Sequence, residues 1–188
     1  SKLKIPTSAK KFFKEKWKIT KLYPPQKEAV KPVLDGENTL ISIPTASGKS
    51  LIAYIGIIQK LLVTNTGSKA VYIVPLKALA GEKYSELKEI GDFLGLNVGL
   101  SLGDREGDKS NLNNADIIVC TSEKFDSLMR NRPEIMDGLS IIIADEVHLI
   151  HDHSRGPTME INLTRFLNSK HNVQIIALPA TIGNSKNL

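Results

Sequence analysis

The sequence predicts an α/β fold in which helices cover both faces of a mostly parallel sheet. Short runs rich in β-branched residues recur along the chain, and nearly all are apolar without the alternation of a half-exposed strand. Longer amphipathic stretches separate most of these runs. Continuous apolar strands connected by helices are typical of parallel sheets that are buried on both faces. A third observation is a loop of small residues, ending in Gly48-Lys49-Ser50, between the first such strand and the first long helix.

The composition is that of a globular domain without a membrane-spanning segment. With 188 residues, of which 41% are hydrophobic, the chain suits one domain with a sizeable core. No uninterrupted apolar run approaches the roughly 20 residues of a membrane helix, and Cys120, the single cysteine, cannot form an intramolecular disulfide. We therefore expect a cytoplasmic protein with no membrane partner. The net charge of +5 is compatible with a nucleic-acid partner but does not select one.

The predicted elements begin with a basic leader over residues 1–20, with a short helix around Phe12, Phe13 and Trp17, which precedes a domain over residues 21–188. The predicted strands cover residues 39–43, 70–74, 97–101, 116–120, 140–144 and 173–178. The predicted helices cover residues 25–33, 49–63, 77–93, 122–131 and 157–168.

The loop that follows the first strand resembles the phosphate-binding pattern G-x-x-x-x-G-K-[ST]. Its residues are Ile43, Pro44, Thr45, Ala46, Ser47, Gly48, Lys49 and Ser50. Small residues let backbone N–H groups approach phosphate oxygens, and the start of the following helix adds partial positive charge. We therefore expect Lys49 to bind the β- and γ-phosphates of ATP and Ser50 to bind Mg²⁺. Ile43 stands where the pattern has its first glycine, and the alternative is a small-residue turn that begins an ordinary helix.

Two adjacent carboxylates, Asp145 and Glu146, follow the apolar strand at residues 140–144. We expect Asp145 to hold Mg²⁺ through water and Glu146 to orient the attacking water, because phosphoryl transfer depends mainly on positioning and charge stabilisation. The alternative is a solvated acidic turn. Because the carboxyl ends of parallel strands meet at one edge of a sheet, these carboxylates should converge with Lys49 and Ser50 around one triphosphate.

Three histidines follow the acidic pair. His148 is predicted to sense the nucleotide, with His151 and His153 on a surface loop. The alternative is a metal site, since His148 and His151 are one helical turn apart. Neither their spacing nor the single cysteine makes a recognisable zinc ligand set.

Residues 145–148, Asp-Glu-Val-His, form a DExH box. The chain resembles the first RecA-like domain of superfamily-2 helicases, and most closely the archaeal Hjm-type repair helicases of the Ski-like branch. Further motifs match in order over nearly the whole chain: residues 22–26 resemble the Q motif, 43–50 motif I, 75–80 motif Ia, 121–124 motif Ib, 155–158 a segment of this branch, and 180–181 the end of motif III.

The resemblance implies a RecA-like P-loop NTPase fold, with residues 21–188 as a helicase ATP-binding domain. It implies that Gln26 reads the adenine edge and that Thr181 couples nucleotide binding to strand binding. The residues implied to contact the sugar-phosphate backbone of a single strand are Pro75, Lys77, Thr121, Ser122 and Lys124, assisted by Gly103 and Asp104. Pro179 stands where the family usually has serine, so one hydroxyl is missing from the coupling segment.

The function that the resemblance implies is that of an ATP-dependent DNA helicase motor, moving 3′ to 5′ along single-stranded or forked DNA in repair or at replication forks. Such helicases bind ATP between two RecA-like domains, and the second supplies arginine fingers. We therefore expect a fragment of a longer protein that binds Mg-ATP, hydrolyses it very slowly and unwinds nothing without its second domain. Three alternatives stay open: an RNA helicase of the Ski branch, a degenerate domain that only binds nucleic acid, and a small-molecule kinase.

Overall fold

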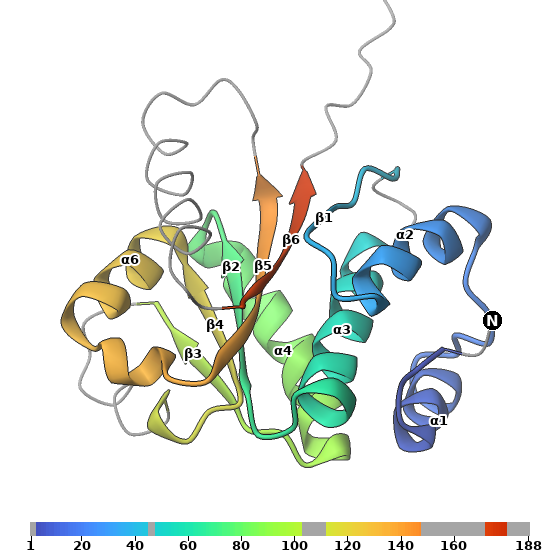
Figure 1. The fold of residues 1–188 in the computed structure, drawn as a ribbon, viewed down its shortest axis with the longest axis horizontal. Coiled ribbons are helices and arrows are strands. Elements are labelled where there is room, and N and C mark those ends of the chain that lie inside the picture. Colours follow the sequence, from blue (N-terminus) through green and yellow to red (C-terminus); the bar gives the residue numbers. More distant parts are fainter. Residues whose placement is uncertain (1–2, 45–47, 103–111, 148–171, 180–188) are drawn as a thin grey trace, which may run out of the picture.

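A parallel sheet forms the centre of the molecule (Figure 1). The computed structural model describes residues 3–44, 48–102, 112–147 and 172–179. Within them the strands are β1 (Thr39–Leu40), β2 (Lys69–Val74), β3 (Val98–Ser101), β4 (Ile117–Thr121), β5 (Leu139–Val147) and β6 (Gln174–Pro179). They are hydrogen-bonded in the order β1-β6-β5-β2-β4-β3, and every pair is parallel. All six carboxyl ends therefore lie at one edge, where ligands bind in sheets of this kind.

Helices cover both faces of this sheet, as the sequence predicts (Figure 1). They are α1 (Thr7–Glu15), α2 (Pro24–Leu34), α3 (Lys49–Gln59), α4 (Lys77–Leu94) and α6 (Ser122–Asn131), with a π-helical turn η2 (Lys60–Thr64) and a 3₁₀ turn η3 (Pro133–Met136). The first four helices share one hydrophobic core with one face of the sheet, and α6 and η3 share a second core with the other face. The helix predicted over residues 157–168 lies outside the described residues.

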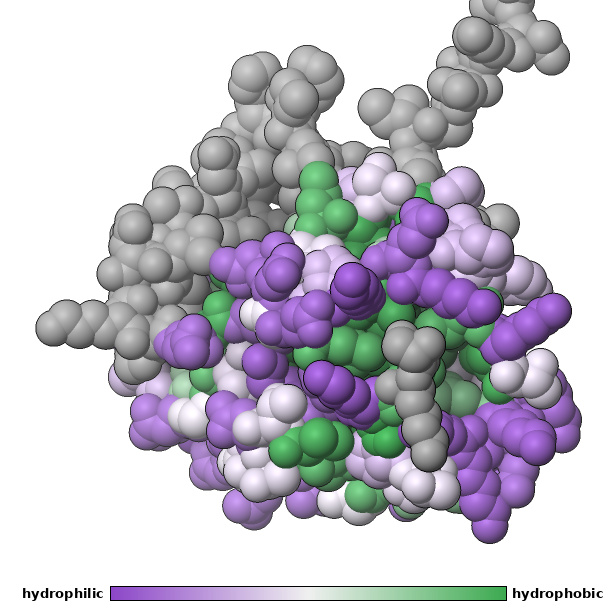
Figure 2. All heavy atoms as spheres, turned by 45° about the vertical axis from the view of Figure 1, so that its right-hand side comes forward, coloured by the Kyte–Doolittle hydropathy of each residue, from purple (hydrophilic) through white to green (hydrophobic). Residues whose placement is uncertain are grey.

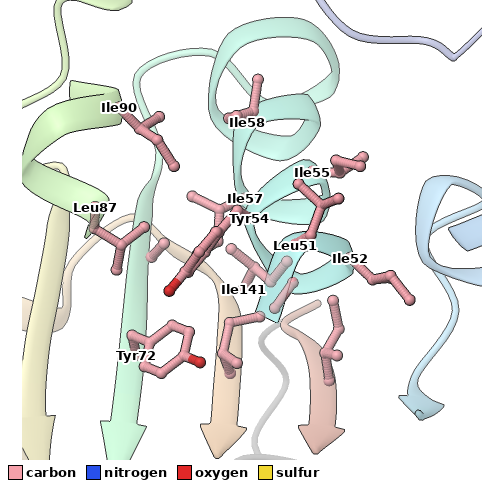
Figure 3. Packing of buried hydrophobic residues seen from close by; sticks show 14 of the residues in the cluster. Leu51, Ile52, Tyr54, Ile55, Ile57, Ile58, Tyr72, Leu87, Ile90 and Ile141 are labelled. Carbon is pink, nitrogen blue, oxygen red and sulfur yellow. The ribbon is translucent and has the colours of Figure 1, made fainter. Parts of the chain in front are cut away.

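Strand β2 explains why the predicted strands lack polar alternation. Ala70, Tyr72 and Val74 pack into the core beneath α3 and α4, whereas Val71 and Ile73 pack into the core beneath α6. Both faces are covered, so successive residues are buried whichever face they point to. Figure 3 shows the first of these cores, with Tyr54 of α3 reaching toward Tyr72.

Two predicted elements end earlier in the structure than in the prediction. The strand predicted over residues 39–43 is regular only over Thr39–Leu40, although the Ile41 N–H still donates a 2.9 Å hydrogen bond to Ala177 of β6. The helix predicted over residues 49–63 is α-helical to Gln59 and continues as the π-helical turn η2. Residues 51–59 are all buried, because α3 lies between the sheet and the other helices of this core.

Helix α1 packs on the same core as the sheet. Its Phe12 and Phe13 are buried, and the ring of Trp17 lies 5.9 Å from that of Tyr54. Trp17 Nε1 also donates a 3.0 Å hydrogen bond to Glu89 of α4. The boundary after residue 20 stays a prediction, but residues on both sides of it contribute to one core.

The outer surface near α1 and α2 is largely polar. Figure 2 shows that hydrophilic side chains cover much of this side of the molecule, with smaller hydrophobic areas between them. In the part of the chain that the structure describes, no helix has both the length and the apolar composition to cross a membrane.

Candidate active site

Gln26 on α2 joins the predicted adenine-binding segment to the predicted phosphate loop. Its side chain is buried, its Oε1 accepts a 2.9 Å hydrogen bond from the Tyr23 N–H, and its Nε2 donates a 3.5 Å bond to the Gly48 carbonyl. Gly48 has a left-handed backbone with φ of +70°, and a Cβ there would lie 2.7 Å from Gln26 Nε2. The backbone conformation favours glycine at this position, and a Cβ would also displace the Gln26 amide.

The loop before Gly48 is described only at its two ends. Ile43 is buried, so its side chain belongs to the core and only its main chain is available for the predicted nucleotide contact. Pro44 is exposed. Thr45, Ala46 and Ser47 lie outside the described residues, and their predicted roles stay predictions.

Lys49 connects the start of α3 to the end of β6. Its ammonium donates a 2.6 Å hydrogen bond to the main-chain carbonyl of Pro179, 130 residues away in the sequence. The contact uses a backbone oxygen, so replacing the usual serine by Pro179 leaves this acceptor in place. Lys49 and the C-terminal end of β6 therefore lie at the same edge of the sheet.

Asp145 is held at that edge from a neighbouring strand. It is 8% exposed, and its Oδ2 accepts a 2.6 Å hydrogen bond from the hydroxyl of Tyr72 on β2. Its Oδ1 accepts a 2.9 Å bond from the backbone N–H of Glu146. Both carboxylate oxygens are engaged, so the side chain has a defined orientation.

Glu146 interrupts the regular pairing of β5 with β6. The register shifts between Asp145 and Val147, and Glu146 has a φ of +50°, which is uncommon for any residue except glycine. Its side chain is exposed while that of Asp145 is buried. The bulge thus turns two consecutive carboxylates into different environments, one fixed in the protein and one facing solvent.

Ser50 lies close to the same tyrosine as Asp145. Burial and the negative charge of Asp145 raise the pKa of Tyr72 well above its ordinary value, and the nearby Ser50 hydroxyl opposes this shift. The Ser50 hydroxyl itself accepts a 3.1 Å hydrogen bond from the ammonium of Lys83 on α4. The first turn of α3 and the end of β5 therefore both lie close to Tyr72.

The donor chemistry of Ser50 and Asp145 fits Mg²⁺. A hydroxyl and a carboxylate supply the hard oxygen ligands that Mg²⁺ takes from a protein, alongside phosphate and water. Over the described ranges, no three or more His, Cys, Asp and Glu side chains gather in one group. His148, His151 and His153 lie outside the described residues.

The segments predicted to contact nucleic acid end two adjacent strands. In the β2–β4 pair, Val74 lies opposite Thr121, so Pro75 and Ser122 follow neighbouring strand ends. Thr121 begins α6 as its N-cap, accepting a 3.4 Å hydrogen bond from the Lys124 N–H. Of the remaining residues of this set, Lys77 is exposed, and Gly103 and Asp104 lie outside the described residues. Thr181, the predicted coupling residue, also lies outside them.

Comparison with known families decides the class of this protein. Residues 23–188 match the model of the DEAD/DEAH box helicase family. The chain belongs to the DEAD/DEAH box helicases. The RecA-like fold of this helicase domain agrees with the parallel sheet and with the loop that begins α3.

Two archaeal proteins are among the curated relatives of this helicase domain. It is 46% identical over 193 residues to the ATP-dependent DNA helicase Hel308 of Methanocella arvoryzae, covering 100% of this chain and 26% of that protein. It is 48% identical over 187 residues to Hel308 of Thermococcus kodakarensis, covering 99% of this chain and 16% of that protein. The chain therefore spans about a quarter or less of the length of these two relatives.

Solved helicase structures share the fold. The DUF1998 helicase MrfA bound to DNA superposes with a TM-score of 0.79 and 25% identity, covering 98% of this chain and 28% of MrfA. MrfA bound to DNA and AMPPNP superposes with a TM-score of 0.80 and 26% identity, covering 100% of this chain and 28% of MrfA.

Two residues at this helicase site were not predicted from the sequence. Tyr72 lies within an apolar strand, where a tyrosine is an ordinary core residue. Lys83 lies in an amphipathic helix, where a lysine is normally a solvated surface residue. No spacing pattern distinguishes them, since their partners Asp145 and Ser50 are 73 and 33 residues away.

Proposed function

We propose that this chain is the ATP-binding part of the motor of an ATP-dependent DNA helicase. The observation that carries the proposal is that Lys49, in the first turn of α3, bonds to the end of β6, while Tyr72 fixes Asp145 at the end of the neighbouring strand β5. The ammonium of Lys49, the adjacent Ser50 hydroxyl and the Asp145 carboxylate suit a magnesium-bound triphosphate. This edge is also where α/β sheets bind nucleotides.

Nucleotide binding uses the residues around the start of α3. Lys49 leaves the Pro179 carbonyl and donates to the β- and γ-phosphates, while the N–H groups of the first helical turn face the same oxygens. Gln26 contacts the adenine edge, because one amide group can donate and accept together. Ser50 and Asp145 hold Mg²⁺, with Asp145 acting through water. When bound, Mg²⁺ neutralises phosphate charge during transfer.

Hydrolysis is assigned to the two carboxylates. Tyr72 keeps Asp145 in a fixed orientation, and exposed Glu146 accepts a hydrogen bond from the attacking water and orients it. His148 senses the nucleotide and Thr181 couples its state to the strand. A second RecA-like domain elsewhere in the same parent protein supplies arginine fingers, which contribute about 10³–10⁵ in rate where measured. The chain alone therefore binds nucleotide and turns it over very slowly.

Single-stranded DNA is held at the ends of β2 and β4. Pro75 and Lys77 at one strand end, with Thr121, Ser122 and Lys124 at the next, contact the sugar-phosphate backbone through hydroxyls, N–H groups and charge. Binding is therefore sensitive to salt and largely indifferent to base sequence. ATP-driven closure of the two motor domains moves the protein 3′ to 5′ on single-stranded or forked DNA in the cytoplasm. The DNA-helicase names of the relatives support DNA over RNA.

The experiment that tests the nucleotide site is calorimetric titration of the chain with AMPPNP and Mg²⁺. Lys49→Ala should weaken binding by at least roughly tenfold, because a charged hydrogen-bond donor is lost. Lys69→Ala is the matched control, since Lys69 begins β2 at the opposite edge of the sheet. Equal losses in both variants, or a wild-type chain that binds no AMPPNP, would contradict the proposal.

Strand binding is tested separately with matched single-stranded DNA and RNA in fluorescence anisotropy. Lys77→Ala should weaken DNA binding and reduce the salt slope by about one. Exposed Lys31→Ala on α2 should leave both unchanged. Equal or tighter binding to RNA would favour an RNA helicase instead.

A further inference from the structure

Lys83 of α4 reaches across to the first turn of α3. Its Nζ lies 3.1 Å from Ser50 Oγ, 3.3 Å from Glu82 Oε1 and 3.5 Å from Glu86 Oε2. Its side chain is only 13% exposed. The ammonium therefore has three oxygen neighbours, of which the Ser50 hydroxyl is the one assigned to Mg²⁺.

The Lys83 ammonium opposes the binding of Mg²⁺ at this hydroxyl. Its N–H occupies one of the two lone pairs of the oxygen that would ligate the metal, and the two positive charges repel at such short range. Withdrawal of the ammonium removes this repulsion. Glu82 and Glu86 already lie within ion-pair distance, so Lys83 has partners for its charge after leaving Ser50.

The geometry points to a competition at Ser50. The Lys83 ammonium is bonded to the Ser50 hydroxyl when no metal is bound, and Mg²⁺ displaces it when nucleotide binds. This inference rests on the proposed function, because it assumes that Ser50 ligates Mg²⁺. Lys83 is a positioning residue in this scheme. It sets the Mg²⁺ concentration at which nucleotide binds tightly.

The displacement links the metal to α4. This helix begins at Lys77, beside the strand end assigned to nucleic acid, and Lys83 lies in its second turn. Glu86, the acceptor on the next turn, also accepts a hydrogen bond from the Tyr54 hydroxyl of α3. Withdrawal of Lys83 from Ser50 therefore removes a contact between α3 and α4 and leaves its ion pairs inside α4.

The test is the Mg²⁺ dependence of nucleotide binding, measured with a fluorescent AMPPNP at buffered free Mg²⁺ concentrations. Lys83→Met and Lys83→Gln remove the competing charge, so the half-saturating Mg²⁺ concentration should fall by roughly tenfold, the scale of a lost charged hydrogen bond. Lys83→Arg keeps the charge and should remain close to wild type. Circular dichroism melting establishes that each variant is folded.

Lys88→Met is the matched control, because Lys88 lies on the same helix and pairs with Asp92 at the surface. It should leave the half-saturating Mg²⁺ concentration unchanged. An unchanged or higher Mg²⁺ requirement in both folded Lys83→Met and Lys83→Gln overturns the inference. Failure of the wild-type chain to bind AMPPNP at any Mg²⁺ concentration would instead contradict the proposed function.

Discussion

The hydroxyl of Tyr72 donates a 2.6 Å hydrogen bond to Oδ2 of Asp145, a residue 73 positions later in the sequence. Tyr72 is 0% exposed, and the two side chains extend from the neighbouring strands β2 and β5. A hydrogen bond of this kind orients a metal-binding carboxylate and is often as important as the ligand itself. The orientation of the proposed Mg²⁺ site is thus decided by a residue that does not touch the metal.

Tyr72→Phe removes only this hydroxyl. We expect the affinity for Mg-AMPPNP to fall by about tenfold, because Asp145 loses the group that orients it. The free energy of unfolding should fall by about 1–3 kcal/mol, since a buried carboxylate oxygen loses its donor. Calorimetric titration and urea unfolding measure the two effects. Tyr84→Phe on α4 is the control, and an equal loss of affinity there would contradict the role of Tyr72.

Gly48→Ala should destabilise the chain by about 1–2 kcal/mol, the cost of a left-handed backbone for a residue with a Cβ. The new methyl group would also displace Gln26, whose Nε2 lies 2.7 Å from its position. Gly81→Ala is the matched control, because Gly81 lies inside α4 with no atom within 4 Å of an added Cβ. That change should stabilise the chain by about 0.5–1 kcal/mol. Urea unfolding of both variants should give shifts of opposite sign.

Glu146→Gly tests the strained backbone at the acidic pair. The φ of +50° costs a glutamate about 1–2 kcal/mol, and glycine removes this cost. Glycine also has a larger conformational entropy in the unfolded chain, which cancels part of the gain. We therefore expect a net gain of about 0.5–1 kcal/mol in the free energy of unfolding. Glu146→Gln keeps the strain and should show no gain. Both variants should stop ATP turnover in the longer parent protein while leaving nucleotide binding intact.

Phe12→Ala tests whether α1 belongs to the core. Phe12 is 1% exposed, so truncation should cost about 3–5 kcal/mol in the free energy of unfolding. Lys11→Ala at the neighbouring exposed position should change it by less than about 0.5 kcal/mol. If Phe12→Ala changed the free energy of unfolding as little as Lys11→Ala, in both thermal and urea unfolding, α1 would not belong to the core of the domain.

Alkaline pH should destabilise the chain through Cys120. Burial raises the pKa of this thiol from 9.0 to about 12, although the charge of Lys124 opposes the shift. Above pH 9 the unfolded thiol ionises while the folded thiol keeps its proton, so its stabilising contribution is complete below that pH and is lost as the pH approaches 12.

Urea unfolding between about pH 8 and 11 should therefore show a falling free energy of unfolding. Cys120→Ala should make this decline shallower by up to about 1.4 kcal/mol per pH unit. Part of the decline should persist in that variant, because burial also raises the pKa values of Tyr54 and Tyr72. An identical slope in wild type and variant would count against the Cys120 contribution.

Much of the fold could be predicted because its signals are local. Apolar strands, amphipathic helices and the Gly48-Lys49-Ser50 turn depend on neighbouring residues, and each predicted element within the described residues is present, although β1 and α3 are shorter than expected. The convergence of Lys49, Ser50 and Asp145 was also predictable, because parallel strands bring their carboxyl ends together. The functional roles of these residues stay predictions.

From the sequence alone we could predict which residues carry the chemistry, and the sequence determined which edge of the sheet Lys49, Ser50 and Asp145 share. Only the tertiary structure decided their immediate partners: Tyr72 for Asp145, Lys83 for Ser50 and the Pro179 carbonyl for Lys49. The physical reason is that hydrogen bonds depend on positions to within a few tenths of an ångström. Such positions follow from the packing of elements that are distant in sequence, whereas helix and strand patterns follow from residues a few positions apart.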